Sequence, residues 1–234
     1  MSRQHPEAAG TPQQNDPSEL LEVFDARGRP TGRAHTREAI HLHGDWHQAF
    51  HCWIVRAGQD GREIVLQQRS AYKDTFPSQW DAAAAGHWRW GESPEQAARE
   101  IEEELGLHVH FEQLGWVGRE REARWFANGL IDREFHQVYA LEWNAPLATY
   151  RPDPREVSAL AAVPARGLLE LVAGRREQLP ASEAGSVSSS GELEPVELTL
   201  RREDLVPYSV ARLRRLLAWN PRRPASVGNR ESLH

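Results

Sequence analysis

The sequence predicts a single α/β domain, and three observations lead to this prediction. The chain has 234 residues, which at about 150 residues per domain suits one domain with a short extension. Hydrophobic residues make up 39% and charged residues 26% of the chain, a mixture typical of a protein with a buried core. Apolar runs of strand length and helix-like periods follow one another along the chain, and this order favours a layered α/β or α+β fold.

Strand-like segments begin near residue 20. The segments 20–24 and 30–34 flank a polar turn that contains Gly28, which is typical of a β-hairpin. Because apolar runs of four to eight residues are the length of buried strands, the rest of the chain predicts several more. These strands are expected at residues 49–55, 63–68, 80–86, 109–117, 134–142, 157–163 and 196–200.

The clearest helix signal lies at residues 95–105. From Ala98 onward, apolar residues recur at i, i+3 and i+7, which places them on one helical face. Ser93 is a candidate N-cap before Pro94, and Gly106 is a candidate C-cap, so both ends of this helix are predicted. Two further helices are expected at residues 166–173 and 204–219.

The two ends of the chain and one internal segment lack a hydrophobic period. Residues 1–18 and 220–234 predict disordered tails on either side of a domain at 19–219. The Ser/Gly/Glu-rich segment 181–194 predicts a long surface loop. The charged stretch Arg212–Arg215 in the last helix is interpreted as a solvated face.

Composition narrows the class of protein. A formal charge of −6 and an isoelectric point near 6.0 argue against binding of a nucleic acid polymer through a basic field. The single cysteine, Cys52, excludes an internal disulfide framework. No apolar run approaches the ~18–20 residues that cross a bilayer, and the first residues do not resemble a secretory signal. We therefore expect a cytoplasmic protein that does not enter a membrane.

The predicted helix at 95–105 carries a stripe of carboxylates. Glu100, Glu103 and Glu104 lie at i, i+3 and i+4, on one side of the helix. Like charges so arranged repel one another unless a cation lies among them. Carboxylates are ligands for Mg²⁺, which commonly bridges them to substrate phosphates. A solvated acidic face is the alternative, but the glycine-bearing segment Gly86–Gly91 leads into this helix and lets the backbone approach a ligand closely.

Together, these residues resemble the Nudix box. Arg99–Leu107 matches its second half, and Gly86 and Glu92 match the first half with a spacer one residue short. The resemblance covers a core of about residues 45–145 and implies an α/β/α sandwich with a mixed central sheet. It also implies Mg²⁺- or Mn²⁺-dependent cleavage of a diphosphate. By position, Glu100, Glu103 and Glu104 would bind the metal, and Arg99 would orient these carboxylates.

The chain also resembles the isopentenyl-diphosphate isomerase branch of the same superfamily. The matching segments include 47–50, 66–70, 73–77 and 86–92. The resemblance implies a metal held by residues matching His47, His87 and Glu134, with a further upstream histidine, His41 or His43. Glu134 is alternatively the general base that activates water. The residues implied to contact the diphosphate or line its site are Arg69, Lys73, Gly86 and His87.

One departure from the isomerase pattern bears on the reaction. The isomerase has a catalytic cysteine directly before the Gly-His pair, and Ala85 stands there in this chain. A methyl group cannot transfer a proton, whereas the carboxylate helix of a hydrolase is intact. We therefore predict an isomerase-like Nudix hydrolase acting on a small-molecule diphosphate. An isomerase and a non-catalytic diphosphate sensor are the alternatives, and a homodimer is compatible with the family.

Overall fold

The computed structural model describes residues 16–221, so most of the tails predicted at 1–18 and 220–234 lies outside the described residues. An 11-stranded sheet is the centre of the fold, and β10 and β13 form a separate two-stranded ladder. The strands are β1 (Leu20–Phe24), β2 (Pro30–Thr36), β3 (Trp46–Gly58), β4 (Gly61–Arg69), β5 (Trp80–Ala82), β6 (Ala84–His87), β7 (Leu114–Trp125), β8 (Ile131–Glu142), β9 (Val157–Pro164), β10 (Leu179–Pro180), β11 (Glu183–Val187), β12 (Leu193–Pro195) and β13 (Thr199–Leu200).

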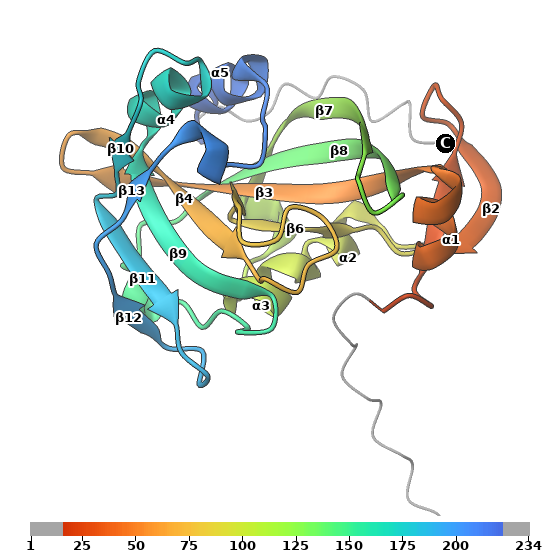
Figure 1. Ribbon diagram of the computed structural model, residues 1–234, viewed down its shortest axis with the longest axis horizontal. Helices are drawn as coiled ribbons and strands as arrows, with labels where there is room; N and C mark the ends of the chain where they lie inside the picture. Colours follow the sequence, from red (N-terminus) through yellow and green to blue (C-terminus); the bar gives the residue numbers. More distant parts are fainter. Residues whose placement is uncertain (1–15, 222–234) are drawn as a thin grey trace, which may run out of the picture.

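Residues 16–221 contain five α-helices beside the sheet, and Figure 1 shows α4 and α5 on one side of the long strand β3, with α2 and α3 on the other. The predicted α/β/α layering is therefore confirmed. The helices are α1 (Arg37–His43), α2 (Pro94–Ala97), α3 (Arg99–Leu105), α4 (Ala165–Val172) and α5 (Val210–Ala218). Within residues 16–221, no helix has the length and apolar content needed to cross a bilayer.

Strand β3 is the central element of the sheet. It pairs with β8 in parallel and with β4, β6 and β1 in antiparallel register, so the sheet is mixed as predicted. Because side chains alternate along a strand, β3 contributes to a core on each face. The two neighbouring residues Cys52 and Trp53 show this burial on both faces. Trp53 packs with residues of α4 and α5, and Cys52 packs with Ile101 of α3.

The helix signal at 95–105 corresponds to two short helices, α2 and α3, joined at Ala98. The hydroxyl of Ser93 accepts a hydrogen bond from the Gln96 amide, and the Gln96 side chain accepts one from the Ser93 amide, which is a capping box. Gly106 ends α3 with φ of 65°, a left-handed conformation that glycine adopts without strain. Both predicted caps are confirmed.

Several expectations need correction. Of the strand predicted at 196–200, only Thr199–Leu200 forms a strand, β13, which pairs with β10. The segment 181–194 is not one long loop: β11 and β12 form a hairpin there, and β11 pairs with β9. The last helix begins at Val210 rather than near residue 204. The strand predicted at 109–117 begins at Leu114 and continues to Trp125. In each case tertiary pairing or packing sets the boundary, which a local pattern does not show.

Candidate active site

A cleft of about 860 Å³ lies where β3, β6, β8 and α3 meet, and its lining includes residues far apart in sequence. It contains most of the predicted site residues. These are Arg69, Lys73, Gly86, His87, Glu100, Glu103, Glu104 and Glu134. Arg99 and His47 are not part of the lining and lie just behind it, in contact with lining residues.

The carboxylates of α3 enter the cleft from one side. Glu100 and Glu104 are buried, while the side chain of Glu103 is 44% exposed. Arg99 lies among them: its Nη1 is 2.5 Å from Glu100 Oε1 and 2.7 Å from Glu103 Oε2. Its Nε donates to Glu92 Oε1 at 2.8 Å. The guanidinium therefore holds two helix carboxylates and Glu92 together, despite the shortened spacer of the box.

Strand β6 brings its backbone against the same carboxylates. The Ala85 amide donates to Glu104 Oε2 at 2.9 Å, and the Gln67 side-chain amide donates to the same oxygen at 2.9 Å. A Cβ placed on Gly86 would lie 2.1 Å from the carboxyl carbon of Glu100. The missing side chain at Gly86 thus makes room for Glu100. The sequence predicts that a ligand approaches the backbone in this glycine segment, whereas at Gly86 it is the Glu100 carboxylate that lies close to the backbone.

Burial changes the protonation of these carboxyls. It raises the pKa of Glu100 to about 8, with the Arg99 charge opposing the rise. It raises the pKa of Glu104 to about 7, against the opposing charge of Lys73. Buried carboxyls of this kind favour either protons or a bound cation, because burial penalises the charged form of each.

Arg69 and Lys73, the residues expected to bind a diphosphate, also line the cleft, but both are already paired. Arg69 Nη1 donates to Asp81 Oδ2 at 2.9 Å. Lys73 forms a close ion pair with Glu156, and its Nζ lies 3.7 Å from Glu104 Oε1. An anionic ligand would therefore compete with these carboxylates for the two cations.

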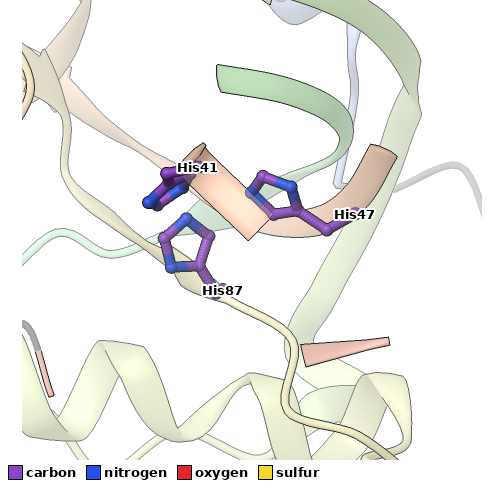
Figure 2. A group of neighbouring side chains, drawn as sticks. All are labelled: His41, His47 and His87. Carbon is purple, nitrogen blue, oxygen red and sulfur yellow. The ribbon is translucent and has the colours of Figure 1, made fainter. Parts of the chain in front are cut away.

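A second polar group contains three histidines, of which His41 and His87 line the cleft. Figure 2 shows the rings of His41, His47 and His87 turned toward one another. The ring centroids are 5.2 Å apart for His41–His47, 5.3 Å for His41–His87 and 4.9 Å for His47–His87. The three come from α1, β3 and β6. Of the two upstream histidines left open by the sequence, the structure thus places His41 in the group, whereas His43 lies near His35 and Asp45.

Carboxylates of β8 complete this histidine centre. Glu134 Oε1 is 3.3 Å from His87 Nε2 and 3.6 Å from His47 Nε2. Asp132 Oδ1 is 3.6 Å from His47 Nε2 and 3.8 Å from His41 Nε2. We call His41, His47, His87, Asp132 and Glu134 the histidine centre.

Several buried atoms of the histidine centre lack hydrogen-bond partners within the described chain, namely Nε2 of His41 and His47 and Oδ1 of Asp132. Unsatisfied buried polar atoms are costly, and a cation among them would satisfy all three. Burial lowers the pKa of His41 to about 4, which favours the neutral imidazole that binds metals. The donor set therefore fits a divalent cation.

Sequence reasoning missed three residues of this region. Asp132 and His136 flank Glu134 at intervals of two residues, so all three project from one face of β8. That alternation was a usable signal, but only once the strand is extended back to Ile131. The third is Arg212, which was interpreted as part of a solvated face. It is 2% exposed, and α5 directs it toward His136.

Comparison with known proteins identifies the family. The NUDIX domain model matches residues 45–182, more than half of the chain. An uncharacterised Nudix hydrolase of Clostridium acetobutylicum is 32% identical over 190 residues, covering 81% of this chain and 91% of that protein. An isopentenyl-diphosphate Delta-isomerase of Nocardia farcinica is 36% identical over 141 residues, covering 60% of this chain and 76% of that protein. A crystal structure from Deinococcus radiodurans aligns with a TM-score of 0.48 at 24% identity, covering 67% of this chain and 90% of that one.

The chain therefore belongs to the Nudix family, and its enzyme class is that of the Nudix pyrophosphohydrolases. The family resemblance predicted from the box residues is confirmed.

Proposed function

We propose that this protein hydrolyses an organic diphosphate in a metal-dependent reaction, by attack of water on phosphorus. The observation that carries the proposal is the convergence of the α3 carboxylates with Arg69 and Lys73 in one cleft. The described lining of that cleft holds eleven Asp and Glu side chains but six Lys and Arg side chains. A diphosphate adds further negative charge, so cations must accompany it for binding to be favourable.

Glu100, Glu103 and Glu104 are the residues that would hold Mg²⁺ or Mn²⁺. Oxygen ligands on a rigid helix suit hard divalent cations, and the pKa values of Glu100 and Glu104 are raised by burial even though Arg99 and Lys73 oppose the rise. Such a cation, when bound, neutralises phosphate charge and lowers the pKa of a bound water. Arg99 orients Glu100 and Glu103, and Arg69 and Lys73 bind the substrate phosphates once their present carboxylate partners are displaced.

The residues of the histidine centre would hold a second cation. Imidazole nitrogen ligands favour a transition metal such as Mn²⁺ over Mg²⁺. Both oxygens of Glu134 are already directed at histidines: Oε2 accepts from His136 Nε2 at 2.7 Å, and Oε1 faces His47 and His87. We therefore assign Glu134 as a metal ligand in preference to a general base, because a base needs a free oxygen directed at water.

The test is the formation of monophosphate products or inorganic phosphate from a panel of diphosphate compounds with Mg²⁺, with Mn²⁺ and with chelator. We expect metal-dependent product from at least one compound and a loss of about 100-fold or more in Glu103→Gln, since removing one charge-stabilising group typically costs that much. Glu102→Gln is the matched control, because Glu102 lies on the same helix but does not line the cleft. Full activity in Glu103→Gln would show that the metal assignment is wrong.

Isomerisation of isopentenyl diphosphate is the second candidate, favoured by the isomerase relative and by the histidine centre. Two observations oppose it. Ala85 offers no proton-transferring group. Cys52 is fully buried on the opposite face of β3 from the cleft, and burial raises the pKa of its thiol. Isopentenyl diphosphate belongs in the panel, with double-bond migration measured beside phosphate release, because migration without release would favour this candidate.

A further inference from the structure

Helix α5 places one charged side chain behind the histidine centre, from a part of the chain beyond the residues that the family model matches. The Arg212 side chain is 2% exposed. Its Nε donates to Glu120 Oε2 at 2.6 Å, and its Nη2 lies 2.7 Å from His136 Nδ1. Burying a guanidinium is costly even when it is paired, so stability alone gives little reason to keep one here.

The contact with Arg212 decides which tautomer His136 adopts, that is, which ring nitrogen carries the proton. An arginine side chain has only donors, so His136 Nδ1 must accept this hydrogen bond and carries no proton. The imidazole proton is then on Nε2, which donates to Glu134 Oε2 at 2.7 Å. Without the guanidinium, either tautomer would be open to His136, and one of them cannot donate to Glu134.

The hydrogen bond from His136 in turn holds the Glu134 carboxylate. With Oε2 fixed by His136, Oε1 is directed at His47 and His87. Arg212 therefore contacts His136, His136 contacts Glu134, and Glu134 faces the other members His47 and His87 of the histidine centre. Residues that hydrogen-bond to metal ligands and so fix their orientation typically lower metal affinity by 10- to 100-fold when they are removed.

We propose that Arg212 is a positioning residue, which through the Nε2–H tautomer of His136 keeps Glu134 oriented toward His47 and His87. The proposal rests on the metal-dependent function proposed above. It adds that the C-terminal helix is part of the site. Arg212 touches neither a substrate nor a metal in this role.

The first measurement is the tautomer of His136 in the metal-free protein, by NMR of ¹⁵N-labelled histidine at one fixed pH. Wild type and the control Arg214→Met, which changes an exposed arginine of the same helix, should both carry the proton on Nε2. Arg212→Met should give a mixture of tautomers. Arg212→Lys keeps the charge but has one nitrogen in place of a fork, so it should give an intermediate result and guards against a folding defect in the Met variant.

The second measurement is Co²⁺ affinity, followed by visible absorption, with His47→Ala identifying which absorption belongs to the histidine centre. We expect a 10- to 100-fold weaker Kd in Arg212→Met and an unchanged Kd in Arg214→Met. An unchanged tautomer in Arg212→Met, or a Kd within twofold of wild type, would overturn the proposal. If wild type shows no Co²⁺ signal that depends on His47, the metal assignment of the histidine centre fails, and the tautomer comparison still decides the role of Arg212.

Discussion

The carboxylate of Glu100 fills the space that a side chain at position 86 would need. We predict that Gly86→Ala displaces the Glu100 carboxylate, since a Cβ would lie 2.1 Å from its carboxyl carbon. A misplacement of about 1 Å at a reacting centre can cost about 100-fold in rate, and we expect a loss of kcat/KM of that order, measured on the substrate found in the panel.

Gly58→Ala is the matched control for this prediction. A Cβ there would lie 2.5 Å from the carboxyl carbon of Glu63, which is a similar steric conflict with a buried glutamate. Gly58 and Glu63 lie in the β3–β4 hairpin and do not line the cleft. Both variants should therefore lose some stability, but only Gly86→Ala should lose activity. Equal activity losses would indicate that general strain, and not the position of Glu100, is responsible.

At the scale of elements, the capping box at Ser93 sets where α2 begins, and this short helix leads through Ala98 into the carboxylate-bearing helix α3. We predict that Ser93→Ala lowers the free energy of unfolding by about 1 kcal/mol, because the Gln96 amide loses its acceptor. Urea denaturation measures this change. Ser190→Ala, in the turn between β11 and β12, is the control and should change the free energy by less than about 0.5 kcal/mol. A smaller effect at Ser93 than at Ser190 would contradict the assigned cap.

Elements with strong local signals could be predicted from the sequence, and those stabilised mainly by distant contacts could not. The hairpin at 20–36 and the caps of α2 and α3 have turn and capping residues that act locally. Helix α1 is seven residues long, too short to show a helical period, and depends on packing of Ile40 against Leu21 and Val23. Strand β11 forms from a Ser/Gly-rich segment because β9 offers it an edge to pair with.

The candidate site divides in the same way. The spacing of Glu100, Glu103 and Glu104 within one helix is a local property, and the structure places all three in the cleft. The histidine centre joins α1, β3, β6 and β8, and no local pattern predicts which upstream histidine reaches it. The burial and contacts of Arg212 could not be predicted from the local sequence, because its partners lie in β7 and β8, 92 and 76 residues earlier in the chain.

At the scale of the whole molecule, the cleft is a concentration of negative charge that protons and cations compete to neutralise. With pKa values raised to about 8 and about 7, Glu100 and Glu104 retain protons at pH 6 in the metal-free protein. A metal ion must displace those protons, so its affinity rises with pH and levels off above about pH 8. At a site whose ligands are already ionised at pH 6, the affinity for the metal would not change between pH 6 and pH 8.

We predict that Mn²⁺ affinity at the α3 carboxylates increases by about tenfold or more between pH 6 and pH 8, since each displaced proton contributes up to about tenfold per pH unit. Calorimetric titration of His47→Ala measures this site with the histidine centre disabled. Adding Glu104→Gln to that background removes one titrating carboxyl, and the pH dependence should become shallower while the remaining affinity falls. An affinity that is flat from pH 6 to pH 8 would mean that Glu100 and Glu104 are ionised before the metal binds, and that the cleft compensates their charge without protons.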